Sequence, residues 1–207
     1  PLLTGWHMKD NKYGAFGRKD ERGRAEFTEE LREMVTELYN CPCIAMWVPF
    51  NEGWGQFDAE RCAAAILEID ATRTIDHASG WHDQGIGDIK SLHVYFDDYR
   101  YSPDKKGRCV VLSEFGGYAW AAEGHVSEQK PFGYKKFKTA DELRRGITLL
   151  YDGQIRPACR SGLAAAVYTQ LTDVEGELNG LITYDRRLVK IAPEAVARMV
   201  RMPPLKK

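Results

Sequence analysis

Residues 44–55 read IAMWVPFNEGWG, and this stretch carries most of the information about the fold. It opens with a continuous apolar run, which is typical of a strand buried on both faces in a parallel sheet. The residues that follow mark a turn, so Glu52 comes directly after the strand. A second apolar run, Val110–Leu112, leads in the same way to Glu114 and then to a pair of glycines.

Helical patterns separate the apolar runs. Thr28 can cap a helix whose apolar stripe includes Leu31 and Val35, and Asp58 can cap a second helix. A capping box at 139–142 opens a third helix. The other predicted segments are surface loops at 7–27 and 118–138, brief strands at 73–76 and 91–95, a third buried run at 163–168 and a helix at about 191–200. Strands that alternate with helices indicate βα units and an α/β fold.

Composition narrows the class of protein. The chain has 207 residues, of which 43% are hydrophobic and 29% charged, and a net charge of −1. We therefore expect one globular domain, or a large piece of one, without the basic field that nucleic acid needs. No apolar stretch approaches the roughly eighteen residues of a membrane span. The five cysteines have scattered spacing, which argues against a disulfide framework.

The two glutamates occupy equivalent places, because each lies just past an apolar run and before glycine. In a parallel barrel both would project over the same rim, where the chemistry of such folds is found. Glycoside hydrolysis needs two carboxyl groups, about 5–5.5 Å apart for retention and about 6.5–9.5 Å apart for inversion. Taken singly, a carboxylate in such a place is more often a hydrogen-bonded structural group.

Aromatic residues gather near the predicted strand ends and in the loops after them. Sugar rings lie well on aromatic rings, and sugar hydroxyls need side chains that donate and accept hydrogen bonds, such as Asn, Gln and His. The alternative is that the aromatic rings cap the core. The predicted substrate-binding residues are Asn51, Trp54, Trp81, His93, Tyr95, Trp120 and Gln170.

A metal site is the competing interpretation of the polar stretch 77–98. A metal-dependent hydrolase would use His77, His93 and Asp97. The sequence lacks the His-Glu-x-x-His pattern and a Cys/His quartet, so we assign no metal ligand and no cofactor. A hard cation held by aspartate oxygens stays open.

Four stretches together resemble glycoside hydrolase family 2, which includes β-galactosidases, β-glucuronidases and β-mannosidases. The resemblance implies that Glu52 is the general acid/base, that Glu114 is the nucleophile of a retaining mechanism, and that Asn51 binds the sugar 2-hydroxyl. It also places Tyr95 beside the nucleophile. The stretches are MWVPFNEGWGQFD (46–58), SGWHDQGIGDIKSLHVY (79–95), VVLSEFGG (110–117) and AAAVYTQLTDVEGELNGLITYDRR (164–187).

The resemblance also implies that the chain is part of a larger protein. It matches strands 4–8 of a (β/α)8 TIM barrel, with a lead-in at 1–27, βα units at 28–202 and a tail at 203–207. The partners would be a carbohydrate substrate, barrel strands 1–3 and N-terminal β-sandwich domains, in a bacterial cytoplasm or periplasm. We expect a β-galactosidase-like exo-glycosidase that acts on a neutral sugar. The alternative is an incomplete or inactive sugar-binding barrel.

Overall fold

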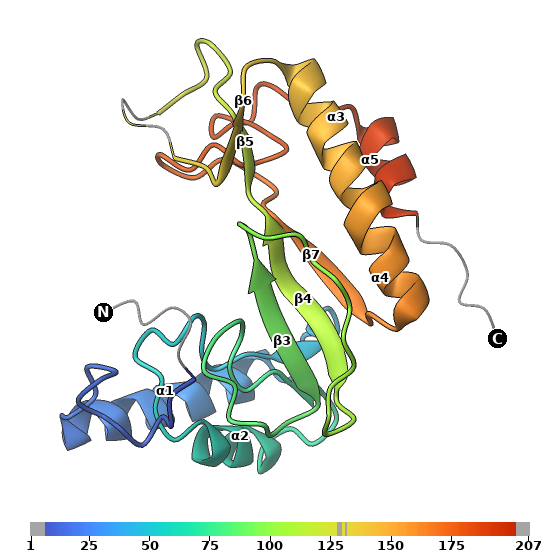
Figure 1. The fold of residues 1–207 in the computed structure, drawn as a ribbon. Coiled ribbons are helices and arrows are strands. Elements are labelled where there is room, and N and C mark those ends of the chain that lie inside the picture. The colour runs from blue at the N-terminus through green and yellow to red at the C-terminus, as the bar shows by residue number, and fades with distance from the viewer. Residues whose placement is uncertain (1–6, 128–129, 131, 202–207) are drawn as a thin grey trace. The chain divides into compact units, whose positions relative to one another are not determined.

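The computed structural model describes residues 7–127, 130 and 132–201. The chain has a mixed α/β fold that contains parallel strands, and it divides into two compact units (Figure 1). Unit 1 comprises Pro1–His93 and Asp104–Val111, and unit 2 comprises Val94–Pro103 and Leu112–Lys207.

Two helices and a short parallel pair of strands build unit 1. The helices are α1 (Glu21–Leu38) and α2 (Ala59–Leu67), and the strands are β1 (Met46–Trp47) and β2 (Thr74–Ile75). They enclose an apolar cluster of buried side chains: Leu31, Val35, Trp47, Phe50, Phe57, Ala59, Cys62, Ala63, Ile66 and Ile75. This cluster fixes the segment after β1, because Phe50 stacks on Phe27 and meets Phe57 edge to face.

A three-stranded sheet has the order β3-β4-β7. Strand β3 covers Ile89–Val94, β4 covers Cys109–Gly116, and β7 covers Ala165–Thr169. The unit boundary falls within β3 and within β4, so each of these strands starts in unit 1 and ends in unit 2. Glu52 follows β1 through a turn, as expected, whereas Glu114 lies within β4, which extends beyond the predicted run to Gly116.

A long helical segment forms part of unit 2. Helix α3 (Ala140–Leu150) continues through a π-helical turn, η1 (Tyr151–Ile155), into α4 (Arg156–Ser161). Pro157 explains the wider turn, because its ring displaces the carbonyl one turn earlier and it has no backbone N–H. Accordingly the N–H of Arg156 bonds to the carbonyl of Tyr151, five residues back. Leu143 and Ile155 on this segment are fully buried.

The rest of unit 2 consists of a second parallel pair and a last helix. Strand β5 (Tyr118–Trp120) pairs with β6 (Lys135–Phe137), and helix α5 covers Pro193–Val200. The strand pair corrects the prediction of one long loop at 118–138. Each strand has only three residues, which is too short for an alternating apolar pattern to predict it.

The first helix begins earlier than the sequence predicted. Asp20, not Thr28, is its N-cap and accepts a hydrogen bond of 3.1 Å from the N–H of Arg22. Thr28 lies inside the helix, where its hydroxyl donates to the carbonyl of Arg24. The polar, Gly-rich stretch therefore hid about two further helical turns, because Phe27 is the only large apolar residue in 21–27 to mark them.

Two apolar runs are less buried than predicted. Val48 beside β1 is 45% exposed and Val167 in β7 is 55% exposed. Strand β7 lies at the edge of its sheet, and β1 pairs only with β2 among the described residues, so neither strand has neighbours on both sides. Within the same residues, no helix has both the length and the apolar character of a membrane span.

Candidate functional site

A tight turn after β1 positions Glu52 in unit 1. The N–H of Glu52 donates to the carbonyl of Ser79 at 2.9 Å, and Asn51 forms a parallel bridge with the same residue. Glu52 has a φ of 52°, which is uncommon for a residue with a side chain. The backbone at Glu52 is therefore strained, and such strain often occurs at functional positions.

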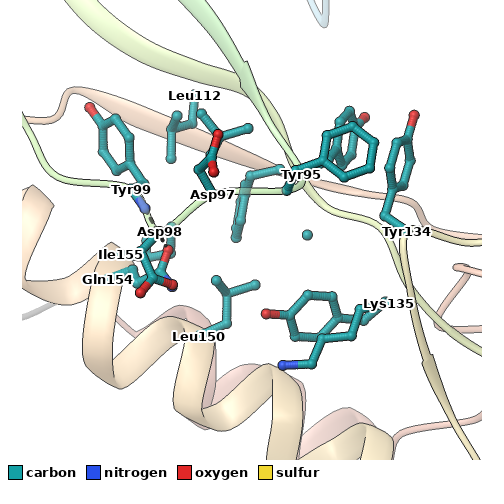
Figure 2. Close-up of a pocket in the computed structure, with 15 residues that line it drawn as sticks. Tyr95, Asp97, Asp98, Tyr99, Leu112, Tyr134, Lys135, Leu150, Gln154 and Ile155 are labelled. Carbon is teal, nitrogen blue, oxygen red and sulfur yellow. Dashed lines mark hydrogen bonds between the residues drawn. The ribbon is translucent and has the colours of Figure 1, made fainter.

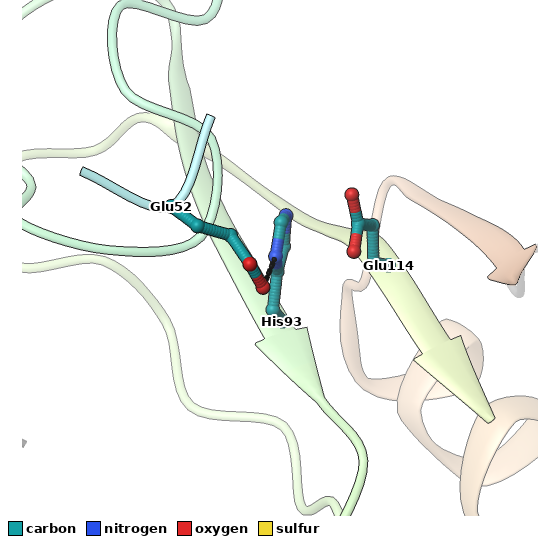
Figure 3. A group of neighbouring side chains, drawn as sticks. All are labelled: Glu52, His93 and Glu114. Carbon is teal, nitrogen blue, oxygen red and sulfur yellow. Dashed lines mark hydrogen bonds and ion pairs between the residues drawn. The ribbon is translucent and has the colours of Figure 1, made fainter. Parts of the chain in front are cut away.

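His93 holds the Glu52 carboxyl group (Figure 3). Its Nδ1 lies 2.9 Å from Oε1 of Glu52, and its Nε2 lies 3.0 Å from the hydroxyl of Ser79. The imidazole is 1% exposed and the Glu52 side chain 19% exposed, so a buried ring presents one nitrogen to a carboxyl group that solvent still reaches. Only a glycine leaves room for the ring at position 80, because a Cβ there would lie 2.5 Å from Cγ of His93.

Three buried polar side chains next to His93 are linked to one another. The hydroxyls of Ser79 and Ser91 lie 3.4 Å apart, and Ser91 hydrogen-bonds to the carboxylate of Asp76. All three of these side chains are buried. Burial raises the pKa of Asp76, while the hydrogen bonds from Ser91 and from the backbone of Ala78 oppose that rise.

Tyr95 holds the Glu114 carboxylate in unit 2. Glu114 lies two residues before the end of β4 (Figure 3), and the Tyr95 hydroxyl donates to its Oε2 at 2.5 Å. The hydroxyls of Tyr95 and Thr169 lie 3.1 Å apart. Burial, followed by the hydrogen bond to Glu114, raises the pKa of Tyr95 well above its ordinary value. The phenol therefore keeps its proton and remains a donor to the carboxylate.

Two glycines allow aromatic rings to approach the strand end. Tyr95 stacks on Tyr134 with a centroid distance of 3.9 Å and an interplanar angle of 3°. A Cβ on Gly117 would lie 2.3 Å from Tyr134, and one on Gly116 would lie 2.5 Å from Tyr168. Both glycines also have positive φ. The Gly-Gly pair after Glu114 is thus needed for the packing that fixes Tyr95.

A cavity of about 240 Å³ lies beside Tyr95 (Figure 2). Tyr134, Lys135 and Asp97 are among the residues that line it. Asp98, also on the wall, accepts a hydrogen bond of 2.6 Å from Gln154. The cavity combines aromatic walls with both signs of charge, a lining suited to a polar ligand that has an apolar face.

The remaining predicted binding residues differ in solvent exposure and in the hydrogen bonds that they already make. Trp54 is 60% exposed, and Trp81 and Trp120 are partly buried. The backbone carbonyl of Trp120 accepts a hydrogen bond of 2.9 Å from Lys190. The amide nitrogen of Gln170 donates to Glu177 and Asn179. A hydrogen bond between Gln170 and a sugar hydroxyl would therefore use the amide oxygen of Gln170 as the acceptor.

The histidines of the competing metal hypothesis have other partners. Nε2 of His77 accepts the N–H of Gln84, whereas His93 bonds to Ser79 and Glu52. Among the described residues, His77 and Asp97 belong to no group of three potential metal ligands. The geometry therefore gives no support to a site built on His77, His93 and Asp97.

Sequence reasoning passed over the small polar residues of the site. Ser79, Ser91 and Asp76 follow or interrupt short strands, and Thr169 ends β7. A serine or threonine in a strand is common for structural reasons, so only the three-dimensional contacts single these residues out. The signal that was present is the SGWHD motif, in which Gly80 makes room for the His93 ring.

Comparison with known proteins adds a fold match. No protein-family model and no curated protein matches the sequence. The structure is similar to a solved β-glucuronidase from an uncultured Clostridium species, with a TM-score of 0.59 and 16% sequence identity. The match covers 88% of this chain and 36% of the β-glucuronidase chain. The chain therefore spans about a third of that protein's length and shares the fold of that part.

Proposed function

We propose that the chain is part of a (β/α)8 barrel that carries both catalytic carboxyl groups of a retaining β-glycosidase. The observation that carries the proposal is that each of the two glutamates is held by a hydrogen bond with a side chain on another part of the chain. Glu52 is held by a buried imidazole, and Glu114 by a phenol that keeps its proton. The fold match to a β-glucuronidase and the resemblance to glycoside hydrolase family 2 support the same assignment.

The proposed reaction has two steps. Glu114 attacks the anomeric carbon and forms an ester with the sugar, while the bond to the leaving oxygen breaks and Glu52 gives that oxygen a proton. Glu52 then takes a proton from water, and the resulting hydroxide displaces Glu114 from the sugar. Each carboxyl group returns to its starting state. This mechanism requires the two carboxyl groups to be about 5–5.5 Å apart in the active protein.

Tyr95 has a distinct part in this mechanism. Its hydroxyl donates to the Glu114 carboxylate and orients the attacking oxygen. When the ester forms, Glu114 loses its negative charge and the hydrogen bond weakens. The Tyr95–Tyr134 stack keeps the phenol in place for the second step, in which Glu114 leaves as a carboxylate again.

The substrate is a terminal β-linked sugar in this proposal. Asn51 would bind the 2-hydroxyl, and Trp54, Trp81 and Trp120 would offer rings to the sugar. In the sequence, no arginine or lysine stands beside either glutamate (residues 49–55 and 110–117) to pair with a uronic acid, which favours a neutral sugar and a β-galactosidase-like exo-glycosidase. Barrel strands 1–3 and β-sandwich domains of a longer polypeptide would complete the site.

A second candidate is an incomplete barrel that binds sugar without turnover. It is favoured by the edge strand β7, where Val167 and the nearby Leu171 are more than half exposed. Such a surface in isolation indicates missing structural neighbours.

A panel of nitrophenyl β-glycosides separates the two candidates. The assay uses the complete parent polypeptide, with Glu114→Gln as the matched variant because it keeps the hydrogen-bond acceptor and removes the charge. We expect turnover of one neutral sugar and a loss of at least about a thousandfold in the variant. Sugar binding without turnover would favour the second candidate, and normal turnover by Glu114→Gln would refute the glycosidase assignment.

A further inference from the structure

We propose that Gln154 positions Tyr95 and, through Tyr95, the nucleophile Glu114. The side-chain amide of Gln154 forms a clamp on the segment 95–99, which follows β3 and begins with Tyr95. The inference rests on the proposed function, because it concerns the residue that holds the nucleophile. Gln154 is a positioning residue in this proposal, since it acts on the substrate through other side chains.

The clamp consists of two hydrogen bonds within unit 2 (Figure 2). Oε1 of Gln154 accepts the backbone N–H of Tyr99 at 2.9 Å, and Nε2 donates to the Asp98 carboxylate at 2.6 Å. A backbone N–H can only donate, so the bond to Tyr99 fixes which end of the amide is the oxygen. The NH2 end then faces an acceptor, and a single orientation of the amide satisfies both bonds.

The π-helical turn places Gln154 beside this segment. The buried residues of the long helical segment recur four apart, at Leu143, Ile147, Tyr151 and Ile155. In a regular α-helix each step of four residues passes a full turn by about 40°, so such a series would move around the helix axis. The wider turn at Tyr151–Ile155 compensates for this drift. It keeps Ile155 in the core, and the half-buried Gln154 next to it reaches the segment 95–99.

Aromatic contacts anchor the other end of the segment. Tyr95 stacks on Tyr134 with a centroid distance of 3.9 Å, and Phe96 meets the same ring edge to face at 5.2 Å. The side chains between the two anchors are exposed, with Phe96 83% exposed and Asp97 and Asp98 also in contact with solvent. Burial contributes little to holding this part of the segment, so its position depends on the anchors at its ends.

The position of the segment decides where the Tyr95 hydroxyl lies. This hydroxyl donates to Oε2 of Glu114 at 2.5 Å. Without the clamp the segment gains freedom at its Tyr99 end, and a shift of Tyr95 would move the hydroxyl away from the carboxylate. A misplacement of about 1 Å can cost about a hundredfold in rate. We therefore expect Gln154 to affect kcat, although its own hydrogen bonds are to Asp98 and Tyr99.

Hydrogen exchange of the Tyr99 amide in the parent polypeptide tests the clamp itself. Gln154→Leu removes both hydrogen bonds, so this amide should exchange about fivefold faster, as read by mass spectrometry of a peptide that covers 95–101. Asp152→Asn is the matched control, because Asp152 is an exposed carboxylate of the same π-helical turn and pairs with Arg156. Equal exchange in the wild type and in Gln154→Leu would overturn the proposal.

An exchange of donor and acceptor between positions 154 and 98 tests the link to catalysis. Gln154→Glu keeps the acceptor for Tyr99 but puts a second carboxylate against Asp98, so kcat should fall at least about tenfold while KM stays within about twofold. Asp98→Asn should lose less, because an amide oxygen still accepts from Gln154. In the double variant the new amide at position 98 donates to the new carboxylate at position 154. Most of the lost kcat should therefore return, which a general loss of packing would not produce.

The results for Gln154 and for Glu114 separate this proposal from the function on which it rests. If Glu114→Gln loses turnover but both Gln154 variants keep kcat within about twofold, the positioning role is refuted. A double variant no more active than Gln154→Glu, or an equal loss in Asp152→Asn, would also refute it. If Glu114→Gln itself keeps normal turnover, the proposed function fails, and the exchange rate of the Tyr99 amide still decides whether the clamp exists.

Discussion

Replacement of Lys190 by Met should strongly destabilise unit 2. The Lys190 ammonium group is fully buried and donates to the Asp173 carboxylate at 2.7 Å, to the carbonyl of Trp120 at 2.9 Å and to the carbonyl of Leu178 at 3.0 Å. Its pKa is lowered and that of Asp173 raised, in both cases because of burial. Each group therefore depends on the other to remain charged inside the protein.

The structure sets the size of the effect. The variant leaves a carboxylate that is 1% exposed without its cation, and it removes one donor from each of the carbonyls of Trp120 and Leu178. Breaking one side of a buried ion pair costs about 3–5 kcal/mol. The thioether side chain of Met fills most of the volume, so a cavity adds little to this loss.

Urea unfolding followed by circular dichroism measures the change. Lys138→Met is the matched control, because Lys138 is exposed and a surface substitution should stay within about 0.5 kcal/mol. The double variant Lys190→Met with Asp173→Leu removes both charges and should recover part of the stability. A loss below about 1 kcal/mol in Lys190→Met would refute the reasoning, because it would mean that solvent reaches the pair.

Three further predictions concern other parts of the chain. Gly117→Ala should reduce turnover by more than an order of magnitude, because its Cβ would lie 2.3 Å from Tyr134, which stacks on Tyr95. Gly124→Ala is the control, because φ is also positive there but nothing lies within 4 Å of the added Cβ. This variant should lose only about 1 kcal/mol of stability and no activity. Cys62 should resist thiol reagents at pH 8, because burial raises the pKa of its thiol to about 12. The exposed Cys43 should react under the same conditions. Rapid labelling of Cys62 in the native protein would contradict this prediction. The pKa of Asp70 is lowered, chiefly by its hydrogen bond with Thr72, so its contribution to stability is present above the unfolded pKa of about 3.9 and should be lost as the pH falls below that value. Acid titration of unfolding should show this loss in the native chain and not in Asp70→Asn.

The sequence was sufficient to predict the elements with strong local signals. The helix capped at Thr139 follows from its capping box, and Asp58 precedes α2 as expected, although its side chain makes no capping hydrogen bond. The two apolar runs predicted strands at β1 and β4, although β4 continues past Glu114 to Gly116. In each case neighbouring residues specify the structure, so a window of a few residues contains the information.

Contacts between distant residues could not be predicted in the same way. His93 and Glu52 are separated by 41 residues, and Tyr95 and Thr169 by 74. Neither pair has a spacing that periodicity can detect. The exposure of Val167 was also hidden, because an apolar run predicts burial only when the strand has neighbours on both sides.

The assignment of the nucleophile is the central claim, and a covalent label tests it most directly. A 2-deoxy-2-fluoro glycoside with a good leaving group should trap the ester in the parent polypeptide, because the fluorine slows the second step. Trypsin separates the two candidates, since Glu52 lies in the peptide 33–61 and Glu114 in the peptide that begins at Cys109. We predict that the added sugar mass appears on the second peptide, at Glu114. A label on Glu52, or none in a polypeptide that turns over the parent glycoside, would contradict the account.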